Sequence, residues 1–217
     1  MINKTFQILE ENTFFIVINK PEGLSAHNGT PSVVEQLTAK KKPTHLVNRL
    51  DQETSGLMII AKDPEHHVEL ADSMEAGSKI YKAVLRSPWK KSDKQTNWSW
   101  SISDKAEGYK NPRGKAADRK EAGTEVTILR SNQYFTEIRA ELLTGRQHQI
   151  RKHAAIAGHP VVGDKRYNED KYNKNIEKFY GTKRMQLHAE KLVFEFKGKT
   201  YEFKTSINFD DFFKDQK

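Results

Sequence analysis

The sequence contains no cysteine among its 217 residues. A chain without thiols has no disulfides, no thiolate nucleophile and no zinc ribbon, and we expect a reducing cytoplasm as its compartment. No apolar run approaches the roughly 20 residues that a membrane-spanning helix needs, and residues 1–7 lack the apolar core of a secretory signal. A Gly-x-Gly-x-x-Gly nucleotide loop is also absent, so we expect no cofactor.

Positive charge is concentrated in one segment. The formal net charge is +8, and residues 79–120 hold 12 Lys or Arg against 4 Asp or Glu, whereas the remaining residues balance. Such a patch favours a polyanionic partner, although a solvated basic face without a partner is the alternative. Trp and Tyr residues lie between these cations, a combination typical of phosphate contacts and base stacking. An insertion that merely tolerates length is the competing interpretation.

Apolar patterns predict the elements of the first half. Strands are expected at residues 14–20, 57–61 and 79–85. In the last of these, Tyr81, Ala83 and Leu85 are expected to share the more apolar face. Ser32 and Glu35 form a capping box that begins a helix, and Asp63-Pro64 begins another that ends at Gly77.

The second half predicts more strands and one clear helix. A short strand is expected at residues 98–103, two longer strands near residues 125–129 and 135–143, and a hairpin with a glycine turn at residues 192–203. Thr144 and Gln147 match a capping box for a helix that Gly158 and Pro160 terminate, with Ile150, Ala154 and Ala157 on its buried face. Residues 168–181 read as an exposed loop or frayed helix.

The most informative stretch is residues 48–56, Asn-Arg-Leu-Asp-Gln-Glu-Thr-Ser-Gly, which leads into the apolar strand. This order holds the Asp51 carboxylate in a loop near the end of a core strand, where a rigid scaffold supports a loop that is free for chemistry. The plainer alternative is a turn in which Asp51 acts as a cap and Arg49 pairs with it on the surface.

A second stretch, residues 143–164, contains three histidines at positions 148, 153 and 159. Their spacing lacks the i, i+4 pair with a partnered carboxylate that helical zinc sites use, so no metal site is expected.

Together these stretches resemble the RluA family of RNA pseudouridine synthases. Residues 48–56 are similar to the family signature His-Arg-Leu-Asp-x-x-Thr-Ser-Gly, and residues 144–153 and 158–164 match two further motifs in the right order. Asn19–Gly23, Lys79–Ala83 and Leu187–Ala189 resemble the remaining motifs. The resemblance implies an α+β fold with a mixed, largely antiparallel sheet around a central RNA-binding cleft. It also implies a single catalytic domain over residues 1–217, with no N-terminal accessory RNA-binding module.

The implied activity is the isomerisation of uridine to pseudouridine in rRNA or tRNA. The resemblance assigns catalysis to Asp51, held ionised by Arg151, with Tyr81 stacking on the uracil. Whether Asp51 acts as nucleophile or base stays open. Ile150 and Leu187 are expected to exclude water.

The expected substrate contacts lie partly outside this pocket. The resemblance implies that Arg49 occupies the space that the flipped nucleoside leaves, and the basic segment predicts phosphate contacts by Lys110, Arg113 and Lys115. Asn48 departs from the family's usual His, which affects RNA contacts more than the reaction. The expected partner is structured RNA, with neither DNA nor membrane, and the chain is expected to be a monomer.

Two other function classes fit parts of the sequence. A catalytically silent RNA-binding or RNA-folding protein could use the same scaffold, although Asp51, Tyr81 and Arg151 together disfavour it. A metal-dependent nuclease would need a carboxylate cluster that the sequence does not show, and its activity would be sensitive to chelators.

Overall fold

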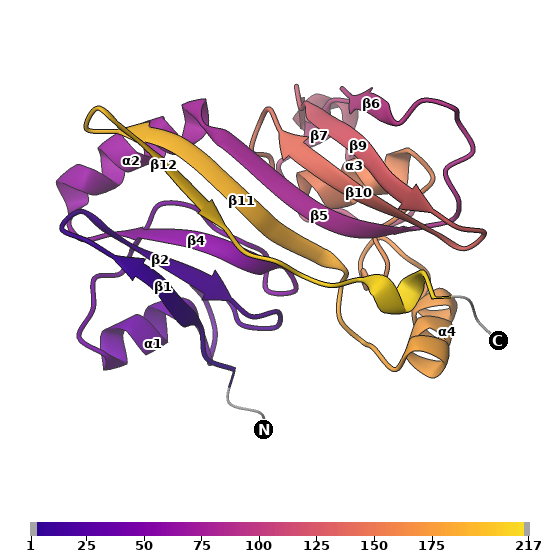
Figure 1. Cartoon of the computed structure of the whole chain (residues 1–217). Helices are drawn as coiled ribbons and strands as arrows, with labels where there is room; N and C mark the ends of the chain where they lie inside the picture. The colour runs from indigo at the N-terminus through magenta and orange to yellow at the C-terminus, as the bar shows by residue number, and fades with distance from the viewer. Residues whose placement is uncertain (1–3, 215–217) are drawn as a thin grey trace. The chain divides into compact units, whose positions relative to one another are not determined.

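The computed structural model describes residues 4–214, and it has the α+β architecture that the sequence predicts (Figure 1). The chain divides into two compact units, Met1–Lys79 with His188–Ser206 and Ile80–Leu187 with Ile207–Lys217. Their positions relative to one another are not determined, and the expected central cleft stays a prediction. Residues 1–3, part of the segment in which no secretory signal is expected, lie outside the described residues. No helix within residues 4–214 is long and apolar enough to cross a membrane.

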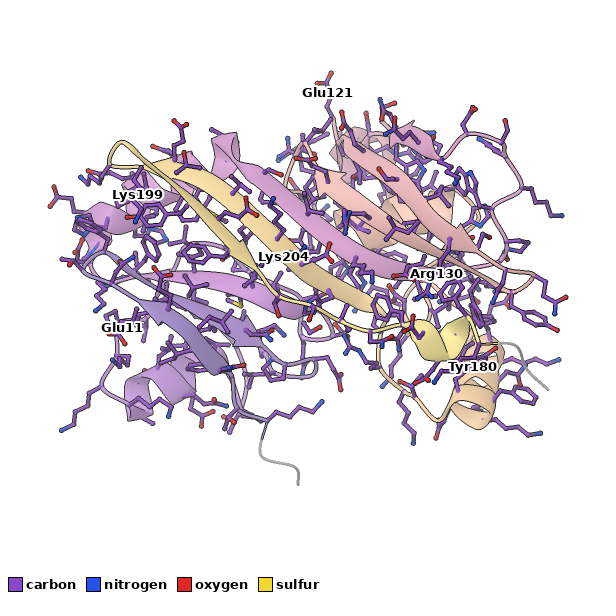
Figure 2. The ribbon with its side chains drawn as sticks, viewed as in Figure 1. Glu11, Glu121, Arg130, Tyr180, Lys199 and Lys204 are labelled. Atoms are coloured by element: carbon purple, nitrogen blue, oxygen red, sulfur yellow. The ribbon has the colours of Figure 1, made fainter. Side chains whose placement is uncertain are left out.

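The first unit is built on a mixed sheet. Its strands follow the spatial order β1 (Gln7–Glu11), β2 (Phe15–Lys20), β4 (Ser55–Ala61), β11 (Leu187–Phe196) and β12 (Lys199–Lys204). The short β3 (His45–Leu46) also pairs with β4. All of these pairs are antiparallel except β4 with β11, which are parallel at Ser55 and His188. Figure 2 shows Lys199 and Lys204 at the two ends of β12. Every residue of β4 is buried, so this strand is the rigid support for the loop before it.

Two helices of the first unit begin where local sequence predicts. Helix α1 (Val33–Ala39) has the complete Ser32–Glu35 capping box. In α2 (Pro64–Ala76), the Asp63 side chain accepts a hydrogen bond from the His66 backbone N–H at 2.8 Å. Helix α2 packs its buried Leu70 and Met74 into an apolar cluster with β2, β4 and β11.

The second unit contains an antiparallel sheet. Its strands in spatial order are β5 (Ser78–Arg86), β10 (Phe135–Leu142), β9 (Thr124–Ser131) and β6 (Gln95–Trp98). A separate pair joins β7 (Ile102–Ser103) to β8 (Arg119–Lys120), and η1 (Ala116–Asp118) precedes β8. The predicted single strand at residues 98–103 is therefore wrong, because Trp98 ends β6 and Ile102 begins β7 in a different sheet.

Helix α3 (Gln149–Ile156) contributes to the core beside β9, and α4 (Asp170–Tyr180) carries the buried Ile176. The short turn η2 (Asp210–Phe212) brings Phe212 onto the Tyr180 ring, 5.0 Å between centroids (Figure 2 labels Tyr180). The residue 168–181 segment is thus a helix closed by Gly181 in the left-handed conformation.

The predicted capping box at Thr144 is wrong. The helix begins at Gln149, and its N-cap His148 makes no side-chain cap hydrogen bond. The Thr144 hydroxyl instead donates to the Gln149 side chain at 2.6 Å and accepts from the Gly123 N–H. The Gln149 side-chain amide donates to the Gly123 carbonyl, so a contact with the end of β9 replaces the local cap.

Candidate active site

The Asp51 loop is fixed to the strands of the first unit at both ends. Asn48 accepts a hydrogen bond from the Ile59 N–H at 2.8 Å and donates to the Leu57 carbonyl at 3.3 Å. The Asp51 carbonyl accepts from the Thr54 N–H at 3.1 Å, which closes a tight turn just before β4. Asn48, the departure from the family signature, is therefore a structural anchor of the loop.

Within this loop Asp51 is half-buried and Arg49 is exposed. Leu50, between them, is buried at 6% exposure and fastens the loop to the core. The loop therefore holds the carboxylate partly shielded from water and leaves the Arg49 side chain exposed. The roles that the resemblance implies for these two residues stay predictions.

Gly56 is required where β4 runs beside β11. Its φ of +119° is a conformation that residues with a side chain rarely adopt, and a Cβ there would collide with the Ala189 carbonyl. The adjacent Ser55 hydroxyl lies 2.7 Å from His188 Nδ1. The Ser-Gly part of the motif is therefore explained by the contacts between β4 and β11.

Lys20, at the end of β2, is a site feature that the sequence interpretation missed. Its side chain is fully buried, and its ammonium donates to the carbonyls of Leu24 at 2.7 Å, Pro21 at 3.1 Å and Gln52 at 3.2 Å. Burial lowers the pKa of Lys20 to about 7, while the negative charge of Asp51 opposes that shift. Two signals in the sequence pointed to Lys20: it closes a strand expected to be buried, and it lies in the Asn19–Gly23 motif.

Gln52 links the lysine to the catalytic candidate. Its carbonyl accepts from Lys20 and also from the Gly23 N–H at 2.6 Å, and its side chain donates to the Gly23 carbonyl at 3.1 Å. The turn that follows β2 is therefore hydrogen-bonded to Gln52, the residue after Asp51. Lys20 therefore holds the loop in place through its hydrogen bonds, and in its protonated form it is a positive charge near the carboxylate.

In the second unit, Arg151 is held by a carboxylate that the sequence interpretation did not assign. Arg151 is 2% exposed, and its Nε and Nη2 donate to the two Asp164 oxygens at 2.7 and 3.0 Å. Asp164 is fully buried and also accepts from the N–H groups of Arg166 and Tyr167 at 2.8 and 3.1 Å. The bidentate pair fixes the plane of the guanidinium. Both members of this ion pair therefore lie inside the core of the second unit.

Tyr81, Ile150 and Leu187 share one apolar cluster, and their role as the walls of a pocket stays a prediction. Ile150 and Leu187 are buried in one apolar cluster of the second unit, and the half-buried Tyr81 packs against it. Ala83 and Leu85 join the same cluster, which confirms the predicted apolar face of β5. Arg151 directly follows Ile150, which is a member of this cluster.

The basic segment, residues 79–120, is held against α3 by hydrogen bonds. Lys152, fully buried, donates to the carbonyls of Ser103 at 2.6 Å and Lys105 at 2.8 Å. His153 lies 2.9 Å from the Trp100 carbonyl and 3.0 Å from the Thr124 hydroxyl, and burial lowers its pKa. Both residues are structural anchors that the sequence analysis did not identify.

Of the predicted phosphate ligands, Lys110 and Lys115 are exposed and Arg113 is half-buried. The Arg113 Nε donates to the Ser101 carbonyl at 3.3 Å, which orients this side chain along its own segment. The two lysines are therefore better placed for phosphate contacts than Arg113.

Each histidine of the second stretch has a protein partner. His148 lies 3.2 Å from the Tyr167 hydroxyl, and His159 lies 3.2 Å from the Arg86 carbonyl. Within residues 4–214, no three His, Asp or Glu side chains gather as a metal site requires.

Comparisons with known proteins agree on one family. A family model described as RNA pseudouridylate synthase matches residues 14–156. Ribosomal large subunit pseudouridine synthase C of Haemophilus influenzae is 32% identical over 93% of this chain and 65% of its own length. The protein of the same name from Escherichia coli is 32% identical over 88% of this chain and 62% of its own length. The chain thus spans less than two thirds of either relative.

Solved structures show the same fold. Human RNA Pseudouridylate Synthase Domain Containing 1 superposes with a TM-score of 0.74 at 22% identity, covering 94% of this chain and 84% of that one. Human RNA Pseudouridylate Synthase Domain Containing 4 also gives a TM-score of 0.74 at 22% identity, covering 94% and 90%.

Proposed function

Because the chain belongs to the RNA pseudouridylate synthase family, we propose that it isomerises uridine to pseudouridine in a structured RNA. The family match confirms the resemblance that the motifs predict. Since the relatives are named for the large ribosomal subunit, rRNA is the first substrate to test, with tRNA as the alternative. The proposal includes a cytoplasmic monomer that contacts neither DNA nor membranes.

The reaction exchanges one bond for another within the nucleotide. The bond from ribose C1′ to uracil N1 breaks, and a bond from C1′ to C5 forms. The C5 proton leaves, and N1 regains a proton, so atoms and electrons balance without an oxidant. The chemistry therefore needs a group that acts on the sugar, a surface that holds the detached base, and a route for one proton.

Asp51 is the group that acts on the sugar in this proposal. Carboxylates in other glycosyl reactions either add to the sugar carbon or remove a proton, and both roles stay open here. The turn to Thr54 and the Asn48 anchor support precise positioning, because they tie the loop to a fully buried strand.

Arg151 is proposed to pair with Asp51 and keep it ionised. A carboxylate in a dry pocket would otherwise be driven toward its neutral form. A guanidinium has five N–H donors, enough to hold two carboxylates at once, and two of those of Arg151 donate to Asp164. Lys20, when protonated, adds a second positive charge near Asp51 from within the first unit.

Tyr81, Ile150 and Leu187 are proposed to receive the extruded uracil. Base chemistry in paired or stacked RNA requires the nucleotide to be flipped out. The Tyr81 ring offers a stacking face on an otherwise apolar cluster, and the flanking aliphatic side chains exclude water. Arg49 is proposed to enter the space left in the RNA, for which its exposure suits it.

The observation that carries the proposal is the family match across the Asp51 loop and α3. Its test is pseudouridine formation by the purified full chain on rRNA and tRNA transcripts. Asp51→Asn and Asp51→Ala should abolish turnover, whereas the control Asp72→Asn, at an exposed position on α2, should leave turnover unchanged. RNA binding without product by the unaltered protein would favour the silent RNA-binding alternative. RNA cleavage abolished by a chelator would favour the nuclease.

A further inference from the structure

A cavity of about 790 Å³ lies in the second unit, lined by none of the residues proposed for catalysis. It forms where the segment after β5 meets β6 and the end of α3. Its aromatic and basic lining residues are Trp89, Lys90, Lys91, Trp98, Trp100 and His159. Cavities of about 300–1,000 Å³ are the size that small organic ligands occupy, so a nucleotide fits by volume.

Aromatic rings form part of the wall, and their positions are fixed. The half-buried Trp89 donates from its backbone to the Ser131 hydroxyl at 2.9 Å and from Nε1 to the Asp93 carbonyl at 3.0 Å. Its ring centroid is 5.2 Å from that of His159, at 41° between planes. Trp100, also half-buried, contacts the anchored His153 ring edge-on at 6.0 Å. These rings are stacking surfaces that need no reordering before a ligand binds.

The charge of the wall is positive. Lys90 and Lys91 are exposed, and Lys91 Nζ lies 5.6 Å from the Trp89 ring centroid. No residue that lines the cavity is acidic. A cation beside a stacking ring is the arrangement that binds a phosphate and its base together.

Polar groups capable of recognising a base edge complete the cavity. The side chains of Asn97 and Gln133 are exposed on its wall, and each amide offers both a donor and an acceptor. Such amides can bond the exposed edge of an unpaired base, whereas the same edge in duplex RNA is already paired.

We propose that this cavity binds an unpaired nucleotide of the RNA substrate, distinct from the uridine that is isomerised. The base stacks on Trp89 and Trp100, and its phosphate contacts Lys90 and Lys91. This inference rests on the proposed function. It adds that the protein recognises single-stranded RNA next to the target uridine.

The first test measures RNA affinity directly in full-length protein carrying Asp51→Asn, so that no product forms. The probes are a fluorescent oligouridylate and a blunt RNA duplex of equal charge, compared at moderate salt by anisotropy. Trp89→Ala should weaken oligouridylate binding about tenfold, the effect of losing one stacked base, and should affect the duplex much less. Trp89→Phe should restore most of the affinity.

Tyr134→Ala provides the matched control, because Tyr134 is a 51% exposed aromatic of the same unit that does not line the cavity. It should leave both affinities unchanged. Equal affinities for the Trp89→Ala and unaltered proteins would overturn the proposal. An equal loss of affinity for the oligouridylate and the duplex would also overturn the proposal, because Trp89 would then not distinguish an unpaired base from a paired one.

A second measurement needs no variant and remains decisive if Trp89→Ala does not fold. Oligouridylate containing iodouridine is crosslinked to the unaltered chain, and the modified peptide is identified. Crosslinks at Trp89 or Trp100 are expected, and crosslinks confined to other peptides would refute the site. Pseudouridine formation is assayed separately. A protein that binds RNA in the cavity but is inactive can therefore be distinguished from one that is active but does not bind RNA there.

Discussion

Replacing Lys20 with methionine removes the buried ammonium beside the Asp51 loop. The Lys20 side chain is fully buried, and its pKa falls from the ordinary 10.5 to about 7 because burial penalises the charged form. Between these pH values the unfolded chain binds a proton that the folded protein lacks. Stability therefore rises with pH across this window.

The size of the effect follows from the two pKa values. Below pH 7 both states carry the proton, and the full penalty of burying the charge is present. As pH rises toward 10.5 the penalty is relieved by up to about 5 kcal/mol, at about 1.4 kcal/mol per pH unit. Methionine does not titrate. It also loses the three carbonyl hydrogen bonds, each worth about 1 kcal/mol. Their loss lowers the unfolding free energy at every pH more than it changes the dependence of that free energy on pH.

Urea unfolding of both proteins at a series of pH values measures this effect. From about pH 7.5 to pH 9.5, the unfolding free energy of the unaltered protein minus that of Lys20→Met should increase by about 2–3 kcal/mol. The exposed Lys40 supplies the control, since Lys40→Met should give a flat difference. A flat difference for Lys20→Met as well would mean that the ammonium is not desolvated, and the reasoning would fail.

Three further predictions concern other parts of the site. Asp164→Ala leaves the Arg151 guanidinium buried without its bidentate partner and should lower the unfolding free energy by about 3–5 kcal/mol in a urea titration; a loss below about 1 kcal/mol would show that the pair is dispensable. Lys110→Glu with Lys115→Glu should weaken RNA binding and reduce the slope of log affinity against log salt by about 1.5–2, and an unaltered slope would remove these lysines from the phosphate contacts. Gly56→Ala places a Cβ against a β11 carbonyl in a φ region reserved for glycine, so thermal melting should fall by several degrees; an unchanged melting temperature would contradict that clash.

Features whose partners are near in sequence were predictable. The Ser32–Glu35 capping box and the Asp63 cap form as expected, because each needs only a backbone N–H three residues away. The alternation in β5 likewise placed Tyr81 and Leu85 on the face that packs into the core.

Features that depend on distant partners were missed or wrong. Thr144 appeared to be an N-cap, but its hydroxyl meets Gly123 and Gln149, and the helix begins five residues later. The sequence analysis gave Lys152 no role, yet its side chain is buried and donates to a carbonyl nearly fifty residues earlier. Each outcome follows from the need to satisfy buried polar groups, which a local pattern does not contain.

The sequence by itself determined the family and the identities of the candidate catalytic side chains, because each of those residues stands in a contiguous motif whose chemistry resides in the residue type. Only the tertiary structure decided what holds those side chains in place. Arg151 found its partner in Asp164, and Lys20 found carbonyls on either side of the Asp51 turn. Both outcomes arise because a charge removed from water must find its compensating groups wherever the folded chain brings them.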